Sequence, residues 1–221
     1  MGKLIVFEGI DGSGKSTQFE MMFKRLLSES RDFKRIVFPR YNEPSSTLIR
    51  MYLRGEFGNN PDSVNAYAAS SFYAVDRYAS FVQDWRDYYE NGGLILTDRY
   101  TTSNALHQGA KVSAKDREQF FKWLYDYEFS LIGLPSPDMV MYMDIDADLA
   151  AERLRQREAE TDTNADIHES DMAYLYKCVE SGRQAAALYG WHSIMCTSAG
   201  VERNKDDMHL EIYSELHGLL S

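Results

Sequence analysis

A glycine-rich segment near the start of the chain combines the residue types and the spacing that hold phosphate groups. Residues 9–16 read Gly-Ile-Asp-Gly-Ser-Gly-Lys-Ser and follow an apolar run at residues 4–7, with Glu8 between the two. Between a strand and a helix, this G-x-x-x-x-G-K-S pattern turns backbone N–H groups toward an anion. Lys15 can then reach the β- and γ-phosphates of a nucleotide, and the Ser16 hydroxyl can ligate Mg²⁺. The pattern predicts a nucleotide site; a glycine-rich turn that only caps a helix is the alternative.

A carboxylate and a cation stand side by side at Asp98 and Arg99, directly after the strand candidate Leu94–Thr97. An aspartate at the tip of a buried strand can hold Mg²⁺ through water. The neighbouring guanidinium can bind a phosphate through two parallel hydrogen bonds. The pair predicts a metal and phosphate site, and a structural salt bridge between the two residues is the alternative.

A stiff loop with one cation follows another strand candidate. Residues 38–44 read Phe-Pro-Arg-Tyr-Asn-Glu-Pro, and the two prolines restrict the backbone on both sides of Arg40. Such a loop could hold a phosphate at a fixed distance from the sheet through the guanidinium. A solvated arginine on a surface loop is the alternative.

An aromatic ring and a second cation lie four residues apart, at Tyr73 and Arg77. On a helix they share a face. The ring can stack on a planar base while the guanidinium donates to a base carbonyl. Aromatic residues at helical spacing are more often part of a core, so this pair alone is weak evidence for a base site.

A basic helical stretch covers residues 147–160 and includes Arg153, Arg155 and Arg157. Arg153 and Arg157 share a helical face, and residues 159–169 are polar and acidic without periodicity, which predicts mobility. A mobile basic segment at 147–168 could close as a lid and bring positive charge to a transferring phosphoryl group. A solvated surface helix with salt bridges is the alternative.

The elements that must position these residues alternate along the chain. The predicted strands are Lys3–Glu8, Arg35–Phe38, Leu94–Thr97, Met139–Asp144 and Ser193–Cys196. The predicted helices are about Lys15–Glu29, Thr47–Arg54, Asp62–Asn91, Ala114–Phe129, Asp148–Glu160, Glu169–Tyr189 and Lys205–Leu219. Alternation of this kind predicts a three-layer α/β fold, with a five-stranded parallel sheet flanked by helices. Ligands collect at the carboxyl ends of such strands, where each motif above is expected to lie.

Composition agrees with one soluble enzymatic domain over residues 1–221. A chain of 221 residues that is 44% hydrophobic can bury one large core. The net charge of −10 argues against a nucleic-acid partner. No apolar run approaches a membrane span, and the start of the chain shows no signal-peptide pattern. Cys178 and Cys196 stand alone, so we expect a reducing, cytoplasmic location.

Taken together, these segments resemble those of thymidylate kinases, the dTMP kinases among the P-loop nucleoside-monophosphate kinases. Residues 7–18 are similar to the phosphate loop of these kinases. Residues 73–77 consist of an aromatic residue, three further residues and an arginine, which is the arrangement that these kinases have there. Residues 98–104, Asp-Arg-Tyr-Thr-Thr-Ser-Asn, resemble their D-R-Y-x-x-S segment, and residues 135–138 also match. The resemblance covers roughly residues 3–190 in order, so it is far more specific than any single motif.

The resemblance implies transfer of a phosphoryl group from ATP to dTMP with Mg²⁺, in a homodimer formed through helices. It implies that ATP is bound by Gly9, Ile10, Asp11, Gly12, Ser13, Gly14, Lys15, Ser16 and Thr17. It implies that dTMP is bound by Asp11, Arg40, Tyr73, Arg77, Arg99, Ser103, Asn104 and His107. Catalysis is assigned to Lys15, Asp98, Arg99, Arg153 and Arg157, and metal binding to Ser16 and Asp98.

Some departures and alternatives stay open. Phe72 leaves the stacking position open by one residue, and His107 stands where several relatives have a tyrosine. A kinase of the same fold that acts on dUMP, dCMP or a deoxynucleoside is one alternative, and a nucleotide-dependent regulatory module is another. Residues 204–207 match the N-K-x-D pattern of GTPases, but they open a polar helical stretch instead of ending a buried strand.

Overall fold

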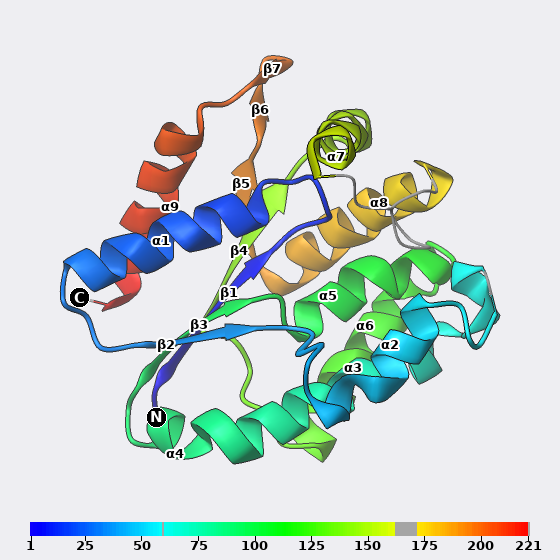
Figure 1. The fold of residues 1–221 in the computed structure, drawn as a ribbon, viewed down its shortest axis with the longest axis horizontal. Helices are drawn as coiled ribbons and strands as arrows, with labels where there is room; N and C mark the ends of the chain where they lie inside the picture. The colour runs from blue at the N-terminus through cyan, green and yellow to red at the C-terminus, as the bar shows by residue number, and fades with distance from the viewer. Residues whose placement is uncertain (59, 162–171, 221) are drawn as a thin grey trace.

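The fold is built on a five-stranded parallel sheet with the strand order β2-β3-β1-β4-β5. A computed structural model of the chain describes residues 1–58, 60–161 and 172–220 (Figure 1). The strands are β1 (Lys3–Glu8), β2 (Lys34–Val37), β3 (Leu94–Asp98), β4 (Met139–Asp144) and β5 (His192–Met195). The predicted α/β fold and its five parallel strands are confirmed, with shifts of one residue at some ends of β2, β3 and β5.

Helices cover both faces of this sheet, and α1 and α9 lie together on one of them (Figure 1). In chain order the helical segments are α1 (Lys15–Ser28), η1 (Pro44–Ser46), α2 (Thr47–Leu53), η2 (Pro61–Ser63), α3 (Ala66–Ser80), η3 (Phe81–Trp85), α4 (Arg86–Glu90), α5 (Thr101–His107), η4 (Gly109–Lys111), α6 (Arg117–Tyr125), η5 (Asp126–Leu131), α7 (Ala147–Thr161), α8 (Met172–Tyr189) and α9 (Lys205–Leu220). A short hairpin of β6 (Thr197–Ser198) and β7 (Val201–Glu202) projects between β5 and α9.

The long helix predicted over residues 62–91 is divided in the structure. Asn65 caps the start of α3 by accepting a hydrogen bond from the Ala68 backbone N–H at 2.9 Å. At the other end of α3, the chain widens into the π-helical turn η3 before α4 begins. The helix predicted over residues 114–129 likewise becomes α6 followed by the π-helical turn η5. Helical periodicity therefore found these segments but not their interruptions.

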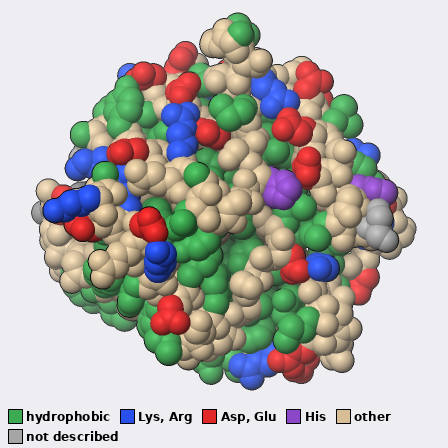
Figure 2. Space-filling view, turned by 180° about the vertical axis from the view of Figure 1, so that it is seen from behind, with side chains coloured by type: hydrophobic (Ala, Val, Ile, Leu, Met, Phe, Trp, Pro, Cys, Tyr) green, Lys and Arg blue, Asp and Glu red, His purple; other side chains and the backbone are tan. Residues whose placement is uncertain are grey.

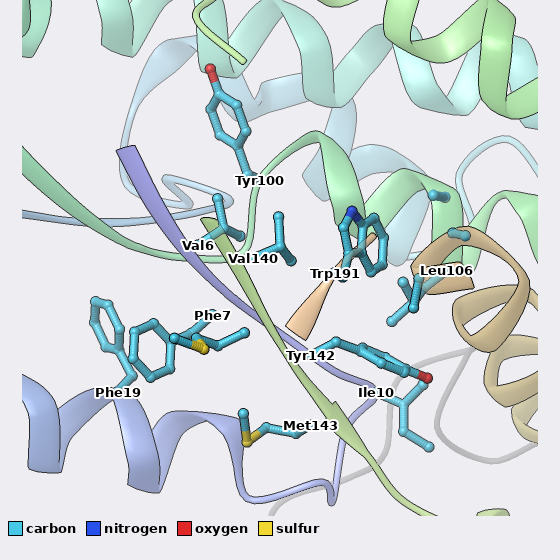
Figure 3. Close-up of a cluster of buried hydrophobic side chains, with 14 of the residues drawn as sticks. Val6, Phe7, Ile10, Phe19, Tyr100, Leu106, Val140, Tyr142, Met143 and Trp191 are labelled. Carbon is cyan, nitrogen blue, oxygen red and sulfur yellow. The ribbon is translucent and has the colours of Figure 1, made fainter. Parts of the chain in front are cut away.

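The core lies between the sheet and its two helical layers. Every residue of β3 and β4 is buried, as expected for strands that are covered on both faces. On one face, Phe7 of β1 meets Phe19 of α1 edge to face, with ring centroids 5.5 Å apart (Figure 3). On the other, Gly182 lets α8 approach the Tyr142 hydroxyl, where a Cβ atom would lie only 2.5 Å away. This packing fixes the carboxyl ends of β1, β3 and β4 relative to one another.

The predicted lid begins where expected but is described only in part. Helix α7 covers residues 147–161, and residues 162–168 of the predicted lid lie outside the described residues, as does the predicted start of α8 at Glu169. Among the described residues, no helix combines the length and the apolar character that a membrane crossing requires. On the face shown in Figure 2, basic side chains are scattered singly among acidic ones.

Candidate functional site

The predicted site residues converge on a cavity of about 270 Å³ at the carboxyl ends of β1 and β3. The predicted residues that line it are Asp11, Lys15, Ser16, Tyr73, Arg77, Asp98, Arg99, Ser103, Asn104 and His107. They come from the glycine-rich loop, from α3, from the end of β3 and from α5. The structure therefore brings together side chains that are up to 96 residues apart in the chain, from Asp11 to His107. Seven further residues complete the lining: Val37, Phe38, Pro39, Tyr41, Leu53, Tyr100 and Gln108.

The glycine-rich loop has the backbone shape that a phosphate cradle needs. Gly12 and Gly14 adopt left-handed conformations with φ of 81° and 84°, and α1 begins directly after them at Lys15. The loop thus ends at a helix N-terminus, which favours anions. The Ser13 hydroxyl is buried and has no hydrogen-bond partner in the described parts of the chain. These features fit a loop that closes around phosphate oxygens.

Lys15 and Ser16 both face Asp98, which ends β3. Lys15 Nζ lies 2.6 Å from Asp98 Oδ1, and the Ser16 hydroxyl donates to Asp98 Oδ2 at 3.4 Å. Burial, together with the charge of Arg99, lowers the pKa of Lys15, although Asp98 opposes that shift. A serine hydroxyl beside a carboxylate is a set of hard oxygen donors of the kind that Mg²⁺ prefers. The donor set at Ser16 and Asp98 therefore fits the predicted metal.

Arg99 connects the glycine-rich loop to α5. Its Nη2 lies 2.5 Å from Asp11 Oδ1, and its Nη1 lies 3.0 Å from His107 Nε2 and 3.6 Å from Glu8 Oε1. Burial alone would lower the pKa of Arg99, but the negative charges of Asp11 and Glu8 outweigh this effect and raise it. Burial likewise opposes the ionisation of Asp11, yet Arg99 and other nearby cations lower its pKa to about 2. Both groups stay charged at neutral pH.

Glu8 is a member of this cluster that the sequence analysis did not select. It is completely buried and accepts hydrogen bonds from the Gly9 backbone N–H at 2.9 Å, from Thr102 at 2.6 Å and from Ser103 at 2.7 Å. These bonds join the glycine-rich loop to α5. An acidic residue at the end of a buried apolar run was the signal that could have identified it.

Tyr73, Arg77 and Asn104, which were predicted to bind the base, also line the cavity. Arg77 is almost fully buried and is held by Glu128, which belongs to η5. Arg77 Nε donates to Glu128 Oε2 at 2.6 Å, and Nη2 donates to Oε1 at 2.5 Å. Glu128 was not among the predicted site residues, because nothing in its local sequence distinguishes it from the other acidic residues of α6 and η5.

Arg40 is the predicted substrate residue that lies outside the cavity. Its Nε lies 3.4 Å from Asp76 Oδ1, its backbone N–H donates to Asp76 Oδ2 at 2.9 Å, and its Nη1 pairs with Asp84. It lines a separate hollow beside β2 with Lys34 and Trp85. The reason is electrostatic: two carboxylates, one on α3 and one on η3, draw the guanidinium away from the cavity. A phosphate-binding role for Arg40 stays a prediction.

Both lid arginines act on the glycine-rich loop. Arg153 Nη1 donates to the Gly12 carbonyl at 3.0 Å, and Nη2 lies 2.6 Å from Glu202 Oε1. The positive charge of Arg157 contributes to the lowered pKa of Asp11, which belongs to the same loop. Arg153 also lines a second hollow of about 580 Å³ beside the loop. The other residues of that hollow are Gly14, Thr17, Gln18, Glu202, Arg203, Asn204, Lys205 and Met208.

The N-K-x-D segment lies at this second hollow, at the start of α9. Asn204 accepts a hydrogen bond from the Asp206 backbone N–H at 2.7 Å, as a helix-capping residue does. The strand before it, β7, belongs to the small hairpin and not to the central sheet. The predicted helical context is confirmed, and it differs from the buried strand end at which a guanine-reading segment stands.

Comparisons with known proteins agree with this geometry. The family model for thymidylate kinase matches residues 7–197. A thymidylate kinase of Mycobacterium tuberculosis is 32% identical over 136 residues, which cover 61% of this chain and 62% of that protein. One of Halothermothrix orenii is 36% identical over 108 residues, which cover 49% of this chain and 50% of that protein. The chain thus spans about three fifths of the length of the first relative and half of the second.

Among solved structures, a thymidylate kinase from Candida albicans has the same fold. It superposes with a TM-score of 0.73 at 22% identity, over 98% of this chain and 92% of that one. The work that describes it reports the origin of its broad substrate specificity and a novel structural element.

Proposed function

Because this chain belongs to the thymidylate kinase family, we propose that it transfers the γ-phosphoryl group of ATP to dTMP, giving dTDP and ADP. The observation that supports this most directly is the junction of two sites at Asp98 and Arg99. Asp98 contacts Lys15 and Ser16 of the nucleotide loop, while Arg99 faces the adjoining cavity with Ser103 and His107. A donor phosphate on the loop and an acceptor phosphate in the cavity would therefore meet at these two residues.

The proposed mechanism is one of positioning and charge neutralisation, as phosphoryl transfer requires. Backbone N–H groups of residues 9–17 hold the donor phosphates, and Lys15 neutralises the charge that develops on the transferring group. Arg99 binds the acceptor phosphate and orients it in line. Arg153 and Arg157 add positive charge from α7. Mg²⁺, which would be held by Ser16 and Asp98, would supply further charge stabilisation of the phosphate oxygens.

The nucleosides would occupy the two hollows on either side of the loop. In the cavity, Tyr73 stacks on the pyrimidine ring, Arg77 donates to a base carbonyl and Asn104 binds the base edge. Asp11 and His107 lie closer to Arg99, where the sugar of dTMP would lie. The second hollow, which contains Thr17 and Arg153, is the place available for the nucleoside of ATP.

The proposed function is tested by measuring ADP release against a panel of acceptors. The purified protein is incubated with ATP and Mg²⁺, and with dTMP, dUMP, dCMP, dGMP or thymidine in turn. We expect ADP release with dTMP well above the rate without acceptor. Release with thymidine but with none of the monophosphates would indicate a nucleoside kinase. Release that no acceptor stimulates would indicate a regulatory module and would contradict the proposal.

We also propose that the protein is a cytoplasmic homodimer, with α3 and η3 at the interface. Val75, Tyr78 and Val82 are 51%, 44% and 41% exposed, and their spacing places them on one side of this helical segment. Apolar side chains gathered on one face are typical of surfaces that associate.

A further inference from the structure

Glu128 connects the two residues that would read the base. Besides its two bonds from Arg77, it accepts a hydrogen bond from Thr101 at 2.7 Å and one from Asn104 Nδ2 at 3.3 Å. Its side chain is completely buried and does not line the cavity. Glu128 therefore acts on a ligand only through Arg77 and Asn104.

The orientation of the Asn104 amide follows from its neighbours. Nδ2 lies 3.3 Å from Glu128 Oε1 and 3.3 Å from the Ser70 carbonyl oxygen. A carbonyl and a carboxylate paired with an arginine can only accept hydrogen bonds. The reversed amide would place Oδ1 against two acceptors, so Nδ2 must face them. Oδ1 then faces away from Glu128, and no residue in the described parts of the chain donates to it.

Glu128 also fixes which N–H groups of Arg77 stay available. The carboxylate takes one N–H of Nε and one of Nη2, and the Tyr100 carbonyl accepts from Nη1 at 3.3 Å. Among the described residues, one N–H on each terminal nitrogen has no acceptor. Because Arg77 lines the cavity, its free N–H groups can only meet an acceptor there.

We propose that Glu128 is a specificity-determining positioning residue: it makes Arg77 a donor and Asn104 Oδ1 an acceptor toward the base. A 4-keto pyrimidine offers the complementary edge, because its O4 accepts and its N3–H donates. A 4-amino pyrimidine reverses both groups, so its amino group would oppose Arg77 and its N3 lone pair would oppose Asn104. The cavity therefore selects thymine and uracil over cytosine. This inference rests on the proposed function.

The test is the acceptor selectivity of Glu128→Gln. The isosteric amide of this variant carries an N–H donor next to Arg77 or Asn104. The Asn104 amide is then no longer forced to turn Nδ2 toward residue 128 and Oδ1 toward the base. We expect the ratio of kcat/KM for dTMP to that for dCMP to fall on the order of tenfold. The ratio for dTMP and dUMP should stay within twofold, because these bases differ only in a methyl group that Glu128 does not touch. A merely structural defect would lower all three activities together and leave both ratios unchanged.

Controls keep the outcomes distinct. Glu118→Gln, the same change at an exposed residue of α6, should keep every rate. If Glu128→Gln does not fold, Asn104→Ala keeps the Glu128–Arg77 pair and should lower the dTMP to dCMP ratio by a similar factor. An unchanged ratio in the folded Glu128→Gln, or in Asn104→Ala where that variant replaces it, would overturn this inference alone. A wild-type protein without dTMP-dependent ADP release would overturn the proposed function instead.

Discussion

Arg99 is the residue at which the two halves of the candidate site meet. Its backbone has a φ of 66°, which is rare for a residue with a side chain. That conformation directs the guanidinium between Asp11 of the glycine-rich loop and His107 of α5. An arginine held in this way is preorganised for a phosphate, because it loses little freedom when the ligand binds.

At the residue scale, we expect Arg99→Ala to lower kcat for dTMP by about 10²–10³-fold, since it removes a preorganised charge from the transferring group. Steady-state ADP release measures the effect. Arg54→Ala, at an exposed position after α2, is the matched control and should keep the wild-type rate. Near-normal kcat in a folded Arg99→Ala variant would contradict the role assigned to Arg99.

The pKa of Lys111 leads to a second prediction at this scale. Its Nζ donates to the Tyr52 hydroxyl at 2.5 Å and to the Val64 carbonyl at 3.0 Å, and burial lowers its pKa from 10.5 to about 8. Between pH 8 and 10.5 the unfolded chain therefore binds more protons at Lys111 than the folded chain does. The contribution of Lys111 to the free energy of unfolding consequently rises with pH.

We expect the free energy of unfolding of the wild type to rise relative to that of Lys111→Met between pH 8 and pH 10. Below pH 8 both states are protonated at Lys111, so the difference should be constant there. Urea denaturation at several pH values measures it. A difference that is flat from pH 7 to pH 10 would show that Lys111 titrates normally in the folded protein.

At the scale of elements, the glycine-rich loop and α7 are in direct contact. A Cβ atom on Gly12 would lie 2.4 Å from the Ala150 carbonyl oxygen, whereas one on Gly133 would meet nothing within 4 Å. Both glycines have left-handed backbones, with φ of 81° and 80°. An alanine at Gly133 would therefore add backbone strain alone, whereas an alanine at Gly12 would add backbone strain and a clash with α7.

We expect Gly133→Ala to lower the free energy of unfolding by about 1–2 kcal/mol, the cost of a left-handed alanine. Gly12→Ala should lower it further and raise the KM for ATP several-fold, because α7 or the loop must move. Thermal or urea denaturation and ATP titration measure the two effects. Equal losses of stability with an unchanged KM would show that the loop does not depend on its contact with α7.

The π-helical turns show what periodicity cannot predict about elements. Residues 62–91 and 114–129 were predicted as uninterrupted helices from their apolar spacing, but η3 and η5 widen both segments. The second of these turns contains Glu128, which pairs with Arg77. A widened turn depends on contacts with other elements, so apolar spacing could not predict it. For the same reason, spacing could not predict that Glu128 lies beside Arg77.

At the scale of the whole molecule, the proposed homodimer gives a direct prediction. We expect Val75→Arg to convert a dimer into a monomer, because it places a charge on the apolar face formed by Val75, Tyr78 and Val82. Sedimentation velocity at micromolar concentration measures the change. Val201→Arg, on the exposed β6–β7 hairpin, should leave the dimer intact. A wild-type protein that sediments as a monomer would contradict this interface.

The features of this protein that depend on neighbouring residues could be read from the amino-acid sequence. The glycine-rich loop, the apolar strands and the pair Asp98–Arg99 were all predicted, because the spacing that creates each feature is local. Family resemblance, carried by several such segments in order, was confirmed by the family match.

The pairing of distant charges, in contrast, depends on how the chain folds. It placed Arg40 with Asp76 and Asp84 outside the cavity, and it brought Glu8 to α5 and Glu128 to Arg77. In each case the cost of burying a charged side chain is offset by interactions with the partners that packing brings close to it. That balance involves elements far apart in the chain, so no local pattern could predict it.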